Sequence, residues 1–539
     1  MRIVDMESAY SRWLPTHMLS TFVYGTILVA LALHPVIKWI RVWNALRCFP
    51  GPSRIIPFWF CLSVWWSKRR TKYSDIPSEF FTVIRDLSSA QTHRNFVGYL
   101  GIAPVVVLQT PDAAEALLAS RLNNRKPFVY KFLEPALGSR NMLTSSGEIW
   151  SKKRRLIAPS FHRKNSESFL MCFNKEANCL MERIEKRLDD SPSVPISQYI
   201  RHSTVQSIFA AAMGVTLDDA TAQQYSRCMH LVEYNFIVRA FRPWTWYQPL
   251  YDVTREGTWF KNEFRKLFDT CCQVLERRRW LNAQEHTLGH PVTAESTHHR
   301  KCHRTCLDVL LEKHHEDPDY SEQEIMEDMN LMIGAGYETT TSAAVHCLYL
   351  ICLSSQIQQK VHEEQDRIFA DDINRDVTAE DIDNMEYLSC CLKETFRLLP
   401  PLPYIARVLD HEIVIDGNVI PKGVTCAVDI FGIHRNPAWF QDPQEFIPER
   451  FMHDAEKEWH PYSYIPFSAG PRKCIGQEFS SVQIKVILSK LFRRFTFEPQ
   501  KPIEKTDFKF EVVLKVKDGI YLWTSRRQPE GTRTQQKGG

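Results

Sequence analysis

The sequence lacks the features that define several common classes of protein. It contains no long basic run and no aromatic residues interleaved with one, and its formal net charge is only +4 over 539 residues. These absences argue against a nucleic-acid-binding protein. Between residue 56 and about residue 523 there is also no internal repeat, low-complexity run or second linker. We therefore expect one large domain, over residues 56–525.

A disulfide framework is missing as well. The chain has 15 cysteines, an odd number, scattered along the sequence and including adjacent pairs at Cys271/Cys272 and Cys390/Cys391. This pattern predicts reduced thiols in a protein that faces the cytosol. The His- and Cys-rich segment 286–306 does not have the ligand spacing of a zinc finger. We interpret it as a solvated loop, with a metal site as the open alternative.

Charged residues are absent from one stretch near the N-terminus. No Asp, Glu, Lys or Arg occurs between Arg12 and Lys38, and this stretch is about long enough to cross a bilayer. We predict a membrane anchor over residues 1–47, retained rather than cleaved as a signal peptide. The basic residues that follow the apolar stretch place the rest of the chain on the cytoplasmic side: Lys38, Arg41 and Arg47.

The remaining segments indicate a mostly helical body. A Pro-rich hinge, residues 48–55, precedes it, and a polar tail, residues 526–539, is expected to be disordered. Strand patterns are few and short, and the clearest is a hairpin around Asp416-Gly417. The predicted fold class is therefore mainly α with small β-sheets (α+β). Apolar residues recur at three- and four-residue steps in residues 174–188, 323–353 and 384–398.

One cysteine has surroundings unlike those of the others. Cys474 lies in "IPFSAGPRKCIG", residues 465–476, between Gly470 and Gly476 and just before a helical pattern. A thiolate that ligates a soft metal must be deprotonated and shielded, and glycines let the backbone approach the sulfur with free N–H groups. The helix that we expect at or beside the cysteine also favours the anion. The alternative, a buried cysteine in a turn, explains the helix but not the rest of the pattern.

The segment "FSAGPRKCIG" resembles the haem-ligand signature of the cytochrome P450 family, Phe-x-x-Gly-x-Arg-x-Cys-x-Gly. The match includes every specified position: Phe467, Gly470, Arg472, Cys474 and Gly476. The resemblance implies a haem b cofactor whose iron is bound by the Cys474 thiolate, with the other four residues in the cofactor-binding loop. Further family signatures follow one another in the right order and extend the resemblance over nearly the whole body.

The first of these signatures is "WSKKR", in which Trp150 and Arg154 lie four residues apart. On a helix this spacing places the indole N–H and the guanidinium on one face, where both can reach one anion. The resemblance implies that this anion is a haem propionate. It also implies that Arg407, shortly after the "PPLP" break, binds the second propionate.

The second signature, "AGYETT", lies at residues 335–340 in a long helical pattern. Gly334 and Gly336 are expected to weaken this helix, at a cost of roughly 1 kcal/mol each relative to Ala, and to open a groove for O₂ and water. Beside them stand an acid, Glu338, and an alcohol, Thr339, which can carry protons into a dry pocket. The resemblance implies that Glu338 and Thr339 are catalytic and supply the protons for cleavage of O₂.

Three further residues have a structural role in the family. Glu394 and Arg397, in "KETFR", lie at i and i+3 and can pair on a largely apolar helix. The family adds a downstream arginine, which matches Arg450 of "PERF" here. Buried charges are costly unless they are paired, so we expect the loss of any of the three to destabilise the fold.

These motifs together imply a membrane-anchored haem-thiolate monooxygenase. The resemblance implies that it inserts one atom of O₂ into a lipophilic small molecule, with electrons from NADPH through NADPH–cytochrome P450 reductase and with cytochrome b5 as a further candidate donor. We expect a single-pass protein of the endoplasmic reticulum membrane with a cytoplasmic catalytic domain. A basic face for an acidic partner is predicted from Lys152, Lys153, Arg155 and Lys473.

Two other functions remain open at this point. One is an O₂-independent peroxide isomerase or dehydratase of the same fold, and the other is a non-catalytic haem carrier or sensor. Segments such as "TSSGEIWSKKRRLIAPSFH" are most similar to the family-4 branch, many of whose members hydroxylate fatty acids at or near the chain end. The resemblance thus implies a fatty acid or a similar lipid. That branch usually has glutamate where this chain has Ala335, a glutamate that can become esterified to the haem.

Overall fold

The computed structural model describes residues 37, 39–51, 76–91, 93–100, 103–162, 166–288, 304–503 and 507–527. Most of the predicted anchor, part of the hinge, most of the 286–306 segment and nearly all of the C-terminal tail lie outside these ranges. In the ranges that are described, no helix is both long and apolar enough to span a membrane.

Helices form most of the body, as predicted. The first half of the chain contains α3 (Ile76–Ala90), α4 (Pro111–Leu118), α5 (Glu134–Leu137), α6 (Gly147–Ile157), α7 (Ser166–Asp190), α8 (Ile196–Ile208), α9 (Asp219–Ala240), α10 (Gln248–Asp252) and α11 (Arg255–Leu288). The second half contains α13 (Cys306–Glu316), α14 (Glu322–Cys352), α15 (Ser355–Ile368), α16 (Ala379–Asn384), α17 (Glu386–Leu398), α18 (Ile430–Ile433) and α19 (Gln477–Arg494). The three periodic segments correspond to α7, α14 and α17, so those predictions are confirmed.

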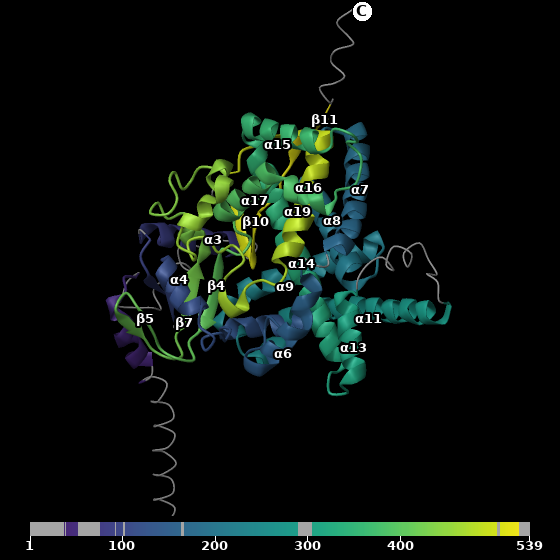
Figure 1. Cartoon of the computed structure of the whole chain (residues 1–539). Coiled ribbons are helices and arrows are strands. Elements are labelled where there is room, and N and C mark those ends of the chain that lie inside the picture. The colour runs from purple at the N-terminus through teal and green to yellow at the C-terminus, as the bar shows by residue number, and fades with distance from the viewer. Residues whose placement is uncertain are drawn as a thin grey trace, which may run out of the picture.

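The strands are short and form small sheets. They are β1 (Phe96–Leu100), β2 (Ala103–Leu108), β3 (Ser193–Val194), β4 (Tyr404–Val408), β5 (Ile413–Ile415), β6 (Asn418–Ile420), β7 (Thr425–Asp429), β8 (Phe495–Pro499), β9 (Phe508–Glu511), β10 (Val513–Val516) and β11 (Leu522–Arg526). The largest sheet has the order β1-β2-β7-β4, in which β2 and β7 are parallel and the other pairs antiparallel. Figure 1 shows β4, β5 and β7 with α4 on one side of the molecule, beside the helical part.

The predicted hairpin is confirmed. Strands β5 and β6 pair antiparallel, with Ile415 opposite Asn418. Asp416 (φ 52°) and Gly417 (φ 73°) connect them, both in the left-handed region that a tight two-residue hairpin turn requires.

The helix α14 is the centre of the helical core. It contacts α8, α11, α17 and α19, and nearly all of its residues are buried. The helix continues through Gly334 and Gly336, so it does not break there. A Cβ at Gly334 would lie 2.7 Å from Met229 Cε, and one at Gly336 would lie 2.6 Å from Ile208 Cδ1. These glycines therefore allow α9 and α8 to pack closely against α14.

Candidate functional site

The cysteine loop is held between a tight turn and the start of α19. A 3₁₀-helix covers Gly470–Arg472, and the Cys474 N–H donates to the Phe467 carbonyl oxygen at 3.0 Å. Gly470 has φ +68°, and a Cβ there would clash with the Leu118 carbonyl oxygen, so only glycine fits. The Phe467 ring packs edge-on against Phe396 at 5.0 Å. The loop is thus fixed on both sides of Cys474.

The Cys474 sulfur lies in a recess of the protein. Desolvation by the surrounding protein raises the pKa of its thiol, although the side chain remains accessible to solvent. A hydrogen bond from the Gly476 N–H and the charges of Arg154 and Lys473 act the other way and favour the thiolate. This combination fits a sulfur that is used as a metal ligand, because a metal ion holds a coordinating thiol in its deprotonated form.

Three cations converge near this loop without an acidic partner. In the described part of the chain, Lys126, Arg407 and Arg472 form no ion pair with a carboxylate. Burial lowers the pKa of each, and the repulsion of Arg407 and Arg472 lowers the pKa of Lys126 further. The Arg472 Nε is buried and has no hydrogen-bond partner. Buried, mutually repelling cations are costly, so this set of side chains fits a ligand that carries more than one negative charge.

Trp150 and Arg154 lie on α6, but their surroundings differ. Trp150 is buried, and the Arg472 guanidinium stacks over its ring at 4.5 Å. Burial lowers the pKa of Arg154, while the negative charge of the Cys474 thiolate raises it. The structure therefore places Trp150 with the converging cations and Arg154 near the sulfur. Lys126, which lies over the Tyr130 ring at 4.8 Å, belongs to the same group but has no sequence motif that identifies it.

The catalytic pair predicted on α14 is divided between two faces of the helix. Ala335 is exposed and Thr339 is partly exposed, although α14 is otherwise largely buried. The Thr339 hydroxyl donates to the Ala335 carbonyl oxygen at 3.0 Å. Glu338 is buried and forms an ion pair with Lys515 of β10. The acid and the alcohol therefore do not contact each other in this conformation.

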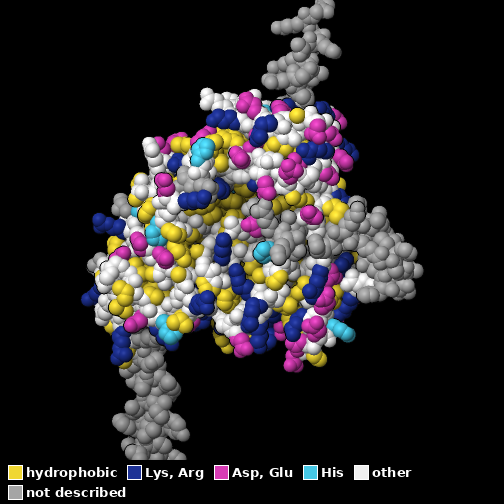
Figure 2. Space-filling view, in the orientation of Figure 1, with side chains coloured by type: hydrophobic (Ala, Val, Ile, Leu, Met, Phe, Trp, Pro, Cys, Tyr) yellow, Lys and Arg dark blue, Asp and Glu magenta, His cyan; other side chains and the backbone are white. Residues whose placement is uncertain are grey.

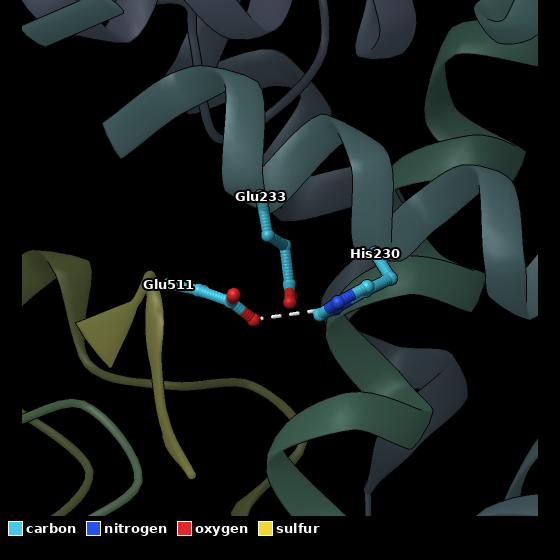
Figure 3. A group of neighbouring side chains, drawn as sticks. All are labelled: His230, Glu233 and Glu511. Atoms are coloured by element: carbon cyan, nitrogen blue, oxygen red, sulfur yellow. Dashed lines mark ion pairs between the residues drawn. The ribbon is translucent and has the colours of Figure 1, made fainter. Parts of the chain in front are cut away.

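Glu338 belongs to a buried cluster that the sequence did not reveal. Lys515 also pairs with Glu233 at 2.5 Å and lies 4.0 Å from Glu511. Figure 3 shows His230 and Glu233 on α9 facing Glu511 of β9, with His230 Nδ1 and Glu511 Oε2 3.3 Å apart. The spacing of these three side chains would suit a metal ion. The Lys515 ammonium already provides the positive charge among them, so we interpret the cluster as an ion-pair network.

The pKa values of the two carboxyl groups that pair with Lys515 shift in opposite directions. Desolvation raises the pKa of Glu233 to about 8, although Lys515 opposes the shift. Lys515, Arg201 and His230 lower the pKa of Glu338 and outweigh its desolvation. Glu338 is thus the carboxylate whose charge this cluster favours, and Glu233 is the one whose charge burial disfavours. A cavity of about 260 Å³ reaches Glu338, and its lining includes Ser197, Arg201, Asp518 and Gly519.

Glu394, Arg397 and Arg450 meet as one network. Arg397 donates to both Glu394 oxygens, at 2.7 and 2.8 Å, and Arg450 Nε donates at 3.0 Å. Arg397 also donates to the carbonyl oxygens of His434 and Glu445, at 3.0 and 2.9 Å. The network therefore joins α17 to the loop that precedes the cysteine segment.

The predicted basic face needs one correction. Lys153 is buried and pairs with Asp328 at 2.6 Å and Glu324 at 2.9 Å, so it cannot meet a partner protein. On α6 the Lys153 side chain points toward α14, which could not be predicted from the run of basic residues in the sequence. Lys152, Arg155 and Lys473 are exposed, as a docking surface requires. Figure 2 shows hydrophobic side chains across the middle of one face of the molecule, with Lys and Arg side chains below them.

The helical body, a recessed thiol at a helix start and the unpaired cations beside it define a haem-thiolate protein. The family model for cytochrome P450 matches residues 52–523. Cytochrome P450 4V2 of Pongo abelii is 31% identical over 94% of this chain and 95% of its own length. Probable cytochrome P450 4ac1 of Drosophila melanogaster is 30% identical over 84% of this chain and 87% of its own.

Among solved structures, retinoic acid bound cyanobacterial CYP120A1 has a TM-score of 0.65 and 22% identity, covering 80% of this chain and 92% of that one. The chain belongs to the cytochrome P450 family. It is a monooxygenase whose cofactor is haem with a cysteine thiolate as axial ligand, and it acts on a small molecule with a redox partner.

Proposed function

We propose that the protein hydroxylates a fatty acid or a similar lipid, with electrons from NADPH through NADPH–cytochrome P450 reductase and cytochrome b5 as a second donor. An aromatic cluster supports this substrate class. Phe80 of α3 lies 4.5 Å from Phe241 and 5.9 Å from Phe510, and Tyr404 lies 6.0 Å from Phe510. Tyr404 lies on strand β4, three residues before Arg407. An apolar substrate gains most from such surroundings.

In this proposal Cys474 ligates the iron, and Arg407, Arg472, Arg154 and Trp150 hold the two propionates. The bound haem supplies the reductive activation of O₂. Gly476 brings its backbone close to the sulfur, and its N–H stabilises the thiolate.

The protons in this proposal come through Glu338. The cavity gives its carboxylate access to water, and the ion pair with Lys515 keeps it ionised; once it leaves Lys515 its pKa rises and it can take up a proton. Transfer to the Thr339 hydroxyl requires the carboxylate to leave Lys515 and turn to the other face of α14. Because the acid and the alcohol are both present, we favour the monooxygenase over a peroxide isomerase or dehydratase.

One experiment separates these functions. The purified protein is reduced under carbon monoxide, then incubated with reductase, NADPH and dodecanoic or hexadecanoic acid. We expect a thiolate-type carbon monoxide band, NADPH oxidation that depends on substrate, and a hydroxylated product in mass spectrometry. Conversion of a lipid hydroperoxide without NADPH, and no hydroxylated acid, would favour the isomerase. The band alone, without either reaction, would favour a haem carrier.

Membrane attachment at the endoplasmic reticulum through residues 1–47 is part of the same proposal. Its support is the uncharged N-terminal stretch. Trp244, Tyr247 and Leu250 are exposed apolar side chains on the body, so deletion of residues 1–47 should release the protein from membranes only in part. Full-length protein that leaves membranes in a low-salt wash would contradict the anchor.

A further inference from the structure

A second buried cation lies apart from the cysteine loop. Arg239, in the last turn of α9, is completely buried. Its guanidinium lies between two aromatic rings, 4.4 Å from the centroid of Phe132 and 4.1 Å from that of Tyr251. Nη2 donates to the Thr245 carbonyl oxygen at 2.7 Å, whereas Nε and Nη1 are buried without a hydrogen-bond partner.

The nearest acids do not neutralise this cation. Glu256 accepts two hydrogen bonds from Arg242, both at 2.9 Å, and Asp252 accepts one from Gln248 at 2.5 Å. No carboxylate among the described residues forms an ion pair with Arg239. Desolvation lowers its pKa, and the fields of Tyr251, Asp252 and Glu256 offset only part of that shift. A buried guanidinium with two free nitrogens is costly unless a ligand completes its hydrogen bonds.

The geometry of the guanidinium specifies what such a ligand must be. Because both faces are covered by rings, only the edges of the group can bind. The single bond to Thr245 uses one of the two hydrogens of Nη2, so one edge still presents a complete pair of N–H donors. A pair of parallel N–H donors matches a carboxylate, which accepts both bonds at once.

Arg239 is connected, through a short helix, to the cations near the cysteine loop. Phe132, which covers one face of Arg239, belongs to the 3₁₀-helix Phe128–Leu133. Tyr130 of the same helix lies under Lys126 and in the field of Arg407. At about 2 Å of rise per residue, Tyr130 and Phe132 are only about 4 Å apart along the helix axis. Tyr130 also packs against Phe236, which precedes Arg239 by one helical turn on α9.

We propose that Arg239 binds the carboxylate of a long-chain acid substrate and is therefore a specificity-determining residue. This inference rests on the proposed function, because it assumes that the substrate is a lipid. The apolar rings around Arg239 would then contact the first carbons of the chain, and the carboxylate would fix one end of the substrate. The other end would be the one that reaches the haem.

The test measures equilibrium binding rather than turnover. Dodecanoic acid, methyl dodecanoate and 1-dodecanol are titrated into the ferric haem-loaded protein, and the change in its absorption spectrum gives each Kd. Wild-type protein should bind dodecanoic acid at least 10-fold more tightly than the two neutral compounds. Arg239→Gln should weaken binding of the acid about 10- to 100-fold, the range for a charge-assisted hydrogen-bond pair, and leave the neutral compounds unchanged.

Two further variants complete the design. Arg239→Lys keeps the charge but loses the paired donors, so it should bind the acid with intermediate affinity. Arg183→Gln, beside the first residue of α9, removes a cation that already has a carboxylate partner, Asp219, and it should not change any Kd. A carbon monoxide difference spectrum checks that each variant is correctly folded.

The possible failures are distinguishable. If none of the dodecyl compounds binds the wild-type protein, the lipid substrate itself is wrong. If the acid and its ester bind wild type equally, or if Arg239→Gln weakens all three compounds alike, Arg239 is a packing residue and the inference is overturned while the lipid substrate remains. If the Arg239 variants do not load haem, equal binding of the acid and its ester by the wild-type protein still overturns the inference.

Discussion

Removal of the charge of Glu394 is the most quantitative test of the scaffold. Glutamine has nearly the same shape as glutamate, so Glu394→Gln creates no cavity and isolates the electrostatic effect. In the native structure this carboxylate accepts hydrogen bonds from Arg397, Arg450 and the Ile447 N–H. Both Glu394 and Arg397 are fully buried. The substitution therefore leaves a buried guanidinium without its counter-charge, which costs about 3–5 kcal/mol.

This free energy translates into a modest change of melting temperature. The entropy of unfolding is roughly 2.1 cal/mol/K per residue, so a body of about 470 residues has close to 1 kcal/mol/K. We therefore expect the apparent Tm of Glu394→Gln to fall by about 3–5 °C. Differential scanning calorimetry of the haem-loaded protein measures it, and the Soret band monitors loss of the native haem site.

The matched control is an ion pair of similar length on the surface. Lys360 Nζ lies 2.6 Å from Glu449 Oε1, but the two side chains are 51% and 38% exposed. An exposed pair contributes at most about 1 kcal/mol, so Lys360→Ala should change the Tm by less than about 1 °C. Equal shifts for the two variants would refute the argument that burial sets the cost of breaking the pair.

Four further outcomes follow from the structure. Cys474→Ser should abolish the thiolate-type carbon monoxide band, and an unchanged band would remove Cys474 as the ligand. Thr339→Ala should retain haem and substrate binding but lower the ratio of product to NADPH consumed, which an unchanged ratio would contradict. Burial lowers the pKa of His434 to about 3. The neutral imidazole therefore contributes fully to the free energy of unfolding above pH 6.5, and about 2 kcal/mol of this contribution is lost when the pH falls to 5. Urea unfolding of His434→Gln should accordingly depend less on pH than that of the wild-type protein. Because Ala335 has no carboxylate, acid–organic extraction after turnover should release the haem unmodified, and haem left on the protein would contradict this.

Local sequence patterns predicted the helices and the hairpin because each depends on neighbouring residues. The periodicity of residues 323–353 follows from burial of one helix, α14 (Glu322–Cys352), and Asp416-Gly417 specifies its own turn. The cysteine loop was identifiable for the same reason, since the positive φ of Gly470 is a local backbone requirement, whereas its close approach to Leu118 is not visible in the local pattern. The helix start at Gln477 also lies where the pattern after Cys474 predicted it.

The contacts that sequence reasoning missed join residues far apart in the chain. Lys515 meets Glu233 and Glu338 across separations of 282 and 177 residues, and no periodic pattern connects them. The packing of Gly334 could not be predicted for the same reason, because the atom that a Cβ there would meet belongs to Met229. A propensity scale assigns glycine a cost in a helix, but it cannot show which neighbouring helix needs the space.

Two sets of desolvated cations differ in what neutralises them, and the difference has a physical meaning. In the first set each cation has a carboxylate of the chain itself: Arg397 with Glu394, Arg278 with Asp308, and Lys153 with Asp328. In the second set no cation forms an ion pair with a carboxylate of the described residues: Lys126, Arg239, Arg407 and Arg472. An unpaired buried charge is costly, so the second set of cations destabilises the folded chain when no ligand is bound. Anionic ligands supply the missing charges, so their binding should stabilise the protein in proportion to the logarithm of ligand concentration over Kd. Under the two proposals made above, the propionates of haem would neutralise the cations near Cys474, and the carboxylate of the substrate would neutralise Arg239.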